Sequence, residues 1–212
     1  MLKRYFQMNT WIVLGLIILI ELIFNLMVQK YALNEATLYN SLANELTIEE
    51  IDNVSKLTHS YAWTTYLWAP LSIITQIFLI AICLTIGALL LRYEIRFKAI
   101  FGIVTKAFAI FALARLMLMG AYMYFGVNQL ADLDYISKLS LYTLLNDRPL
   151  PDWAVMPLQT INLFQIAFIL LLALGLNLLL KRGVTRWIPF VLGTYGTGLA
   201  ISLVLFMLLT FL

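Results

Sequence analysis

Residues 71–91 read LSIITQIFLIAICLTIGALLL, a run without a charged side chain. A helix needs about 20 apolar residues to cross the ~30 Å hydrocarbon core of a bilayer, so this run is long enough. It belongs to one of five apolar segments of the 212-residue chain, at 11–28, 61–91, 99–125, 158–180 and 187–212. Hydrophobic residues make up 63% of the chain and charged residues 12%. The sequence therefore predicts an all-α, polytopic membrane bundle of five transmembrane helices, with one domain over 1–212.

Lysine and arginine are distributed unevenly between the two sets of loops, and this asymmetry sets the orientation of a membrane protein. One set holds Lys3, Arg4, Arg92, Arg96, Lys98, Lys181, Arg182 and Arg186. The other set holds Lys30, Lys56, Lys138 and Arg148 among many acidic residues. The bias alternates through all five crossings. We expect the N-terminus to be cytoplasmic and the C-terminus to lie outside.

The two long loops, 29–60 and 127–157, then lie on the extracytoplasmic side. In the first, leucines recur at helical spacing, and Thr47-Ile-Glu-Glu50 has the form of a capping box that would start a helix. In the second, we expect a short helix, a break at 146–151, and an extended return to the membrane.

Three charged residues fall inside the crossings: Glu21, Lys106 and Arg115. A charge near the bilayer centre is costly, so each needs a partner or a route to water. Lys106 is about 12 Å in from Lys98 and can extend toward the basic loops, whereas Arg115 is too deep to do so. We expect Glu21 to pair with Arg115, which forms either a packing contact or part of a pathway for an ion or solute.

Amide side chains inside the crossings include Gln76, Asn162 and Gln165. They could hydrogen-bond between helices or line a polar path. The last segment contains Gly193-Thr-Tyr-Gly-Thr-Gly198, in which Gly193, Gly196 and Gly198 would permit a close helix contact. The sequence leaves open whether that contact is internal or made to another subunit.

Motifs of known chemistry are absent from the sequence: HExxH, GxSxG and Walker patterns do not occur. One cysteine and one histidine cannot form a structural zinc site. The basic residues lie at segment ends, which argues against a nucleic-acid partner. We expect no catalytic, cofactor-binding or metal-binding residue.

From Arg92 onward the chain resembles the Yip1 family of integral membrane proteins. The resemblance is carried by Phe97-Lys-Ala-Ile-Phe-Gly102, Pro151-Asp-Trp153, Thr160–Phe168, Leu174-Gly-Leu176, Lys181-Arg182 and the glycine-rich last segment. It implies five helices and a short, bacterial-type member in the cytoplasmic (inner) membrane. Only about ten residues precede the first crossing, so the GTPase-binding role of eukaryotic relatives is not expected here.

Three functions fit these observations. The first is a non-enzymatic subunit or scaffold of a larger membrane assembly, whose partners are other membrane protein subunits and the lipid bilayer. The alternative is a small transporter or permease subunit with a polar path around Glu21 and Arg115. The third is a membrane-embedded, lipid-modifying enzyme.

Overall fold

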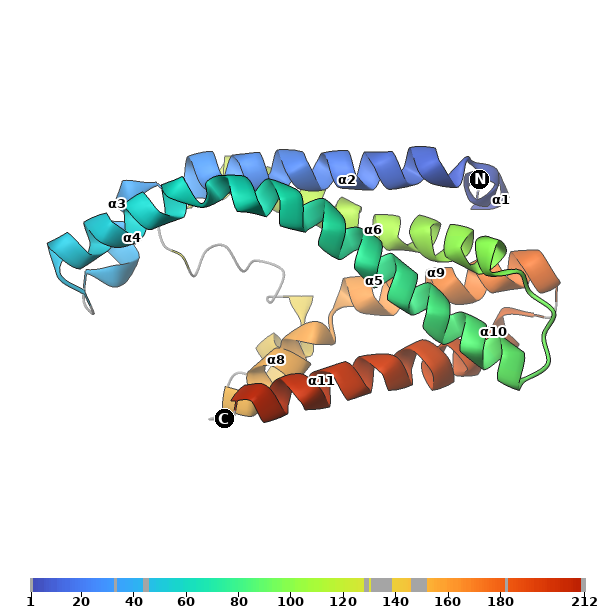
Figure 1. Ribbon diagram of the computed structural model, residues 1–212. Helices are drawn as coiled ribbons and strands as arrows, with labels where there is room; N and C mark the ends of the chain where they lie inside the picture. The colour runs from blue at the N-terminus through green and yellow to red at the C-terminus, as the bar shows by residue number, and fades with distance from the viewer. Residues whose placement is uncertain are drawn as a thin grey trace.

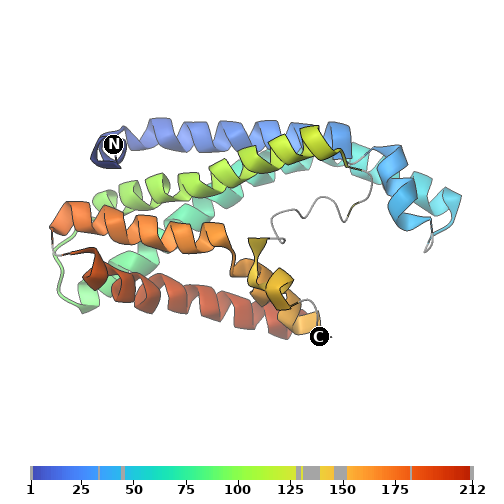
Figure 2. The same ribbon diagram turned by 180° about the vertical axis from the view of Figure 1, so that it is seen from behind.

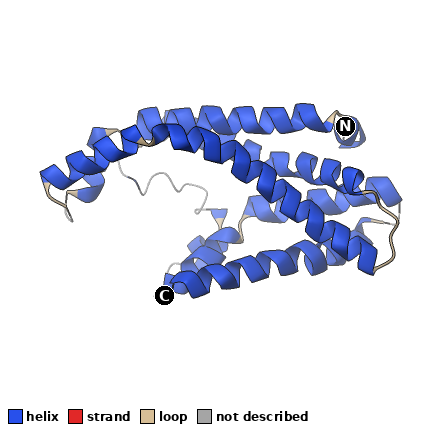
Figure 3. Cartoon of the chain, in the orientation of Figure 1, coloured by secondary structure: helices blue, strands red, loops and turns tan. Residues whose placement is uncertain are grey.

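The computed structural model describes residues 2–32, 34–43, 46–127, 130, 139–145, 152–181 and 183–210. These residues are almost entirely helical, and within them the β contacts amount to one isolated bridge between Ser140 and Asn162 (Figure 3). The elements are α1 (Leu2–Gln7), α2 (Thr10–Met27), the π-helix η1 (Val28–Ala32), α3 (Glu35–Leu42), α4 (Ile48–Ser60), α5 (Ala62–Leu90), α6 (Phe97–Phe125), α7 (Leu141–Leu145), α8 (Asp152–Thr160), α9 (Leu163–Leu180), α10 (Val184–Val191), the π-helix η4 (Leu192–Gly196) and α11 (Thr197–Thr210). The predicted all-α fold is confirmed.

Five helical stretches are long and apolar enough to cross a membrane, as predicted: Thr10–Tyr31, Ala62–Leu90, Phe97–Phe125, Leu163–Leu180 and Val184–Leu208. The first combines α2 with η1, and the last combines α10, η4 and α11. The others are α5, α6 and α9. The first three agree with the predicted bounds to within a few residues.

The fourth crossing begins at Leu163, so the prediction of a continuous helix from residue 158 was wrong. Asn162 has an extended backbone (φ −125°, ψ 170°), and its Oδ1 accepts a hydrogen bond from the Gln165 amide at 2.9 Å. This is an N-cap, which starts a new helix and ends the preceding one. The residues before it form the separate helix α8 rather than the extended return expected in the loop 127–157.

The charged turns lie together at one end of the bundle (Figures 1 and 2). α1, the α5–α6 turn and the α9–α10 turn are at this end, while α3, α4 and α8 lie toward the other. We call the first the basic end, because it carries Lys3, Arg4, Arg92, Arg96, Lys98, Lys181 and Arg186. We call the opposite end, which carries α3, α4 and α8, the loop end. The described basic residues of the loops that were predicted to be cytoplasmic therefore all lie at the basic end.

α5 runs obliquely through the bundle and has different neighbours at its two ends (Figure 1). It packs beside α2 near the loop end and against η4 near the basic end. α6 packs against α2, α5 and α9, so it is the most enclosed crossing. The fully buried large side chains of the crossings include Ile77, Leu84, Ile100, Phe168, Leu172, Leu176 and Trp187.

The first long loop is helical, as predicted. Thr47 caps α4: its Oγ1 accepts from the Glu50 amide, and the Glu50 carboxylate accepts from the Thr47 amide at 2.8 Å. These hydrogen bonds to Thr47 hold the pKa of Glu50 below its ordinary value. Most of the short helix expected in the second loop falls on residues 131–138, outside the described residues, and the expected break at 146–151 also lies outside them.

Candidate functional site

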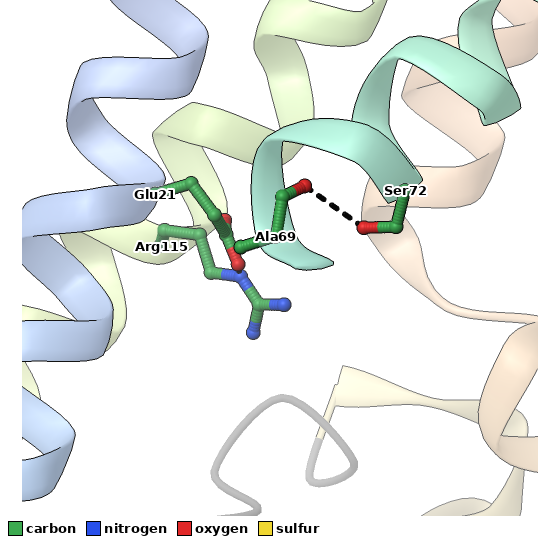
Figure 4. A network of polar contacts seen from close by, with 4 residues as sticks. All are labelled: Glu21, Ala69, Ser72 and Arg115. Carbon is green, nitrogen blue, oxygen red and sulfur yellow. Dashed lines mark hydrogen bonds and ion pairs between the residues drawn. The ribbon is translucent and has the colours of Figure 1, made fainter. Parts of the chain in front are cut away.

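Glu21 on α2 and Arg115 on α6 form an ion pair within the bundle, the pairing that the sequence predicts (Figure 4). Arg115 Nε lies 3.2 Å from Glu21 Oε2. The guanidinium carbon also lies 4.7 Å from the centre of the Phe24 ring. The side chain of Glu21 is 17% exposed and that of Arg115 is 39% exposed. The pair therefore links two crossings while the guanidinium stays accessible.

Arg115 uses one edge of its guanidinium for this contact. Nε donates to Glu21, and in Figure 4 the two terminal nitrogens point away from that carboxylate. In the described part of the chain those two nitrogens donate to no other group. A guanidinium carries five N–H donors, so four of them remain for a further acceptor.

A cavity of about 400 Å³ opens beside this pair and is lined by all five crossings. It lies between the middle of the bundle and the loop end, where α5 and α9 begin. Its apolar wall includes Ile17, Ile73, Ile80, Phe108, Phe111, Phe164 and Leu199. Its polar lining consists of Glu21, Ser72, Gln76, Arg115, Thr160, Asn162, Gln165 and Tyr195. Five of the six polar residues singled out from the sequence thus meet at one place.

The α9 and η4 side of the cavity carries a hydrogen-bonded pair. Gln165 is buried, and its Nε2 lies 2.5 Å from the hydroxyl of Tyr195. The Tyr195 ring packs edge-on against Phe168, with ring centres 5.3 Å apart. Tyr195 is not among the residues predicted from the sequence, although it stands in the glycine-rich stretch at the middle of a crossing, where an aromatic hydroxyl needs a partner.

Departures from regular α-helix coincide with this cavity. The α8–α9 break at Asn162 and the π-helix η4, which contains Tyr195, both contribute to the lining. A third irregularity is Pro70 in α5, which has no N–H to donate to the carbonyl one turn earlier. Two residues on, the Ser72 hydroxyl donates to Ala69 at 2.9 Å (Figure 4). In membrane proteins, non-helical backbone is tolerated where it lines a cavity, and π-helices often mark functional sites.

Lys106 does not join the central cavity. Its Nζ donates to the Phe6 carbonyl of α1 at 2.9 Å, and it lies 3.9 Å from the position of a Cβ on Gly102, one turn nearer the basic end. The side chain thus extends toward the basic end, as predicted. It lines a second cavity, of about 320 Å³, there.

The glycine-rich stretch of the last crossing is divided between two surfaces. A Cβ on Gly198 would lie 3.3 Å from Cys83 Sγ of α5, so this position packs inside the bundle. A Cβ on Gly196 would contact only Leu192 of the same crossing. A Cβ on Gly193 would have nothing within 4 Å, and this residue is exposed. The tightest contact uses a glycine not predicted to take part, because a Cβ on Gly87 would lie 2.0 Å from Thr194 Cγ2. The predicted seam is therefore internal at Gly198 and open at Gly193.

Among the described residues, no three His, Cys, Asp or Glu side chains gather where they could hold a metal ion. Comparisons of the chain with family models, curated proteins and solved structures found no match. The resemblance to the Yip1 family therefore stays a prediction.

Proposed function

We propose that this protein is a small transporter, or the membrane-embedded subunit of a permease, which binds a small polar or amphiphilic solute in the central cavity. One observation carries the proposal: all five crossings meet at a cavity that holds the Glu21–Arg115 pair and three amide side chains. A lone ion pair would support a packing role equally well. The shared cavity favours the transporter alternative over the scaffold hypothesis.

The size and chemistry of the cavity suit a small ligand. Small-molecule sites commonly measure about 300–1,000 Å³ and combine apolar walls with a few polar groups, and the 400 Å³ cavity falls in this range. Arg115 offers hydrogen-bond donors, while Glu21 balances its charge. In transporters, broken helices at such sites supply backbone groups that bind the substrate. The α8–α9 break supports the same role here.

For the orientation, we propose the arrangement that follows from the positive-inside rule. The basic end faces the cytoplasm of a bacterial cell, the C-terminus lies outside, and the protein resides in the inner membrane. Ser72 is ten residues into α5, about 15 Å from its start at the loop end. The central cavity would then be reached by water from the outside.

Cysteine labelling tests the proposal. In a Cys83→Ala background, we expect Ser72→Cys to react with a charged, membrane-impermeant methanethiosulfonate at least about tenfold faster than Leu71→Cys, because a thiol reacts as the hydrated thiolate. Leu71 is at the same depth, is 52% exposed and does not line the cavity. The labelling rate in sealed vesicles is the measurement. Small solutes that slow the reaction of Ser72→Cys, and not that of a soluble thiol, identify the bound class.

A labelling rate of Ser72→Cys as slow as that of Leu71→Cys would show that the cavity is not hydrated and would contradict the transporter proposal. Labelling of Ser72→Cys only from the cytoplasmic face of the membrane would reverse the proposed orientation.

A subunit role is the second candidate, and the open side of the last crossing favours it. Gly193, Thr197 and Ala200 are all exposed, and a side chain at Gly193 would meet nothing within 4 Å. Small exposed residues at such spacing permit another transmembrane helix to approach closely. The partner would be another membrane protein subunit.

Replacement of Gly193 by Leu separates these candidates. In a subunit, Gly193→Leu should disperse a complex isolated in mild detergent while the thermal unfolding of the protomer stays unchanged, since the site has room for the side chain. Gly15→Leu is the matched control, because Gly15 also has nothing within 4 Å but lies on α2. Particle size and the co-purifying chains are the measurements. A wild-type protein that is monomeric under these conditions would rule out the subunit role.

A further inference from the structure

The second cavity, at the basic end, has a charge pattern different from that of the central one. It measures about 320 Å³ and lies between α1, α2, α6 and α9. Three lysines line it: Lys3 of α1, and Lys98 and Lys106 of α6. None of the described residues in its lining is acidic, and in the described part of the chain none of these lysines forms an ion pair. Three positive charges therefore surround one space without a counter-charge.

Lys106 is the fixed member of this group. The residue is 7% exposed, and its Nζ is held by the Phe6 carbonyl at 2.9 Å. In return, the Tyr5 hydroxyl donates to the Lys106 carbonyl at 2.7 Å, so α1 is fastened over the cavity by two hydrogen bonds. Burial raises the pKa of Tyr5, which keeps the phenol protonated as a donor. An ammonium group has three donors, so Lys106 can bond a further acceptor in the cavity.

Close packing of α1 depends on Gly175 of α9. A Cβ at this position would lie 2.7 Å from Phe6 Cε1 and 2.5 Å from Ile103 Cγ2. The absence of a side chain lets the Phe6 ring lie against α9, and this places the Phe6 carbonyl beside Lys106. These contacts hold α1 over the cavity and fix Lys106 in place, while Lys3 and Lys98 line the cavity with exposed side chains.

The start of α6 adds to the positive potential. Its N-cap is Arg96 with no side-chain cap bond, and its first turn contains Lys98 and no acidic residue. The N-terminal end of a helix carries partial positive charge and favours anions, so cations here are unfavourable by themselves. A bound anion would offset both the lysines and the helix end.

We infer that this cavity binds the phosphate of an anionic phospholipid. Basic pockets between transmembrane helices at one membrane face bind such headgroups. The rim also has an apolar part, because Leu178 is 37% exposed and Leu179 is 44% exposed on α9, where an acyl chain can lie. The phosphate contacts Lys3, Lys98 and Lys106, and the chains extend along α9 into the bilayer. This site is independent of the proposed transport function and of the central cavity.

Lipid titration of the purified protein, followed by native mass spectrometry, tests the inference. We expect one dioctanoyl phosphatidylglycerol to bind at least about tenfold more tightly than dioctanoyl phosphatidylcholine, and the double variant Lys3→Gln/Lys98→Gln to lose roughly 10- to 30-fold in affinity. Both lysines are exposed, so the variant keeps the fold. The control Arg4→Gln/Arg186→Gln removes two exposed charges at the same end outside the cavity. It should change the affinity by less than about threefold.

Three results would overturn the inference. Equal binding of the two lipids would show that the cavity does not distinguish lipids by the charge of the headgroup. Equal losses in the lysine and arginine variants would show a diffuse surface effect. Displacement of the lipid by inorganic phosphate at an equal concentration, with the same gain in thermal stability, would assign the cavity to free phosphate instead. Thermal unfolding of each variant without lipid verifies that the fold is intact.

Discussion

Arg115→Met should lower the free energy of unfolding by about 2–3 kcal/mol, because it leaves Glu21 charged and without its partner. Breaking a fully buried pair costs roughly 3–5 kcal/mol, and we expect less because Arg115 is 39% exposed. Glu21→Met should cost a similar amount, since the guanidinium then lacks its counter-charge. Unfolding by sodium dodecyl sulfate in mixed micelles, followed by circular dichroism, measures both.

The double variant Glu21→Met/Arg115→Met decides what the pair is for. Removal of both charges also removes their desolvation cost, so its stability should return to within about 1 kcal/mol of the wild type. If the pair serves only packing, the Ser72→Cys labelling pattern will also be unchanged. If it lines a solute path, solute protection of Ser72→Cys will be lost although the fold is stable. A double variant as unstable as the single ones would show that Arg115 has another essential partner.

The pairing of Glu21 with Arg115 could be predicted because the depth of a charged residue in the membrane restricts which partners it can have. Lys106 is near enough to the basic end to extend toward it, which leaves Arg115 as the deep cation for Glu21, and the structure shows both arrangements. The five crossings could be predicted for a similar reason: length and hydropathy act over about 20 residues and do not depend on individual contacts.

The shape of the cavity could not be predicted, because it depends on local breaks that hydropathy does not register. Residues 158–162 are uncharged, so nothing in their composition separates α8 from α9. The break depends on whether the Asn162 side chain turns back to the Gln165 amide, which competes closely with continuing the helix. The π-helix that turns Tyr195 toward Gln165 leaves no sequence pattern of its own.

The residues that the glycines contact could not be predicted from the sequence either. A glycine-rich helix predicts a close approach, but it does not identify the surface approached. Gly87 is an isolated glycine in α5, and only the oblique path of α5 places it against Thr194. Gly193 belongs to the predicted stretch and yet faces outward.

Gly87→Ala should therefore destabilise the protein by about 2 kcal/mol, within the usual range for an overpacked core site. The new Cβ would lie 2.0 Å from Thr194 Cγ2 and 3.1 Å from Thr194 Cβ. Thr194 cannot easily turn away, because its hydroxyl donates to the Phe190 carbonyl at 2.8 Å. The better helix propensity of alanine offsets at most about 1 kcal/mol of this strain.

Two further variants make this prediction specific to the contact between α5 and η4. Gly15→Ala is the same substitution where nothing lies within 4 Å, so its stability should equal or slightly exceed that of the wild type. Gly87→Ala/Thr194→Ser removes the clashing Cγ2 and keeps the hydroxyl, and it should recover most of the lost stability in the same mixed-micelle unfolding measurement. If Thr194→Ser gives no recovery, the loss at Gly87 comes from the α5 backbone, and α5 and η4 do not pack as closely as the 2.0 Å separation requires. Recovery would show that the closeness of these two crossings, which fixes the η4 side of the central cavity, depends on the missing side chain at position 87.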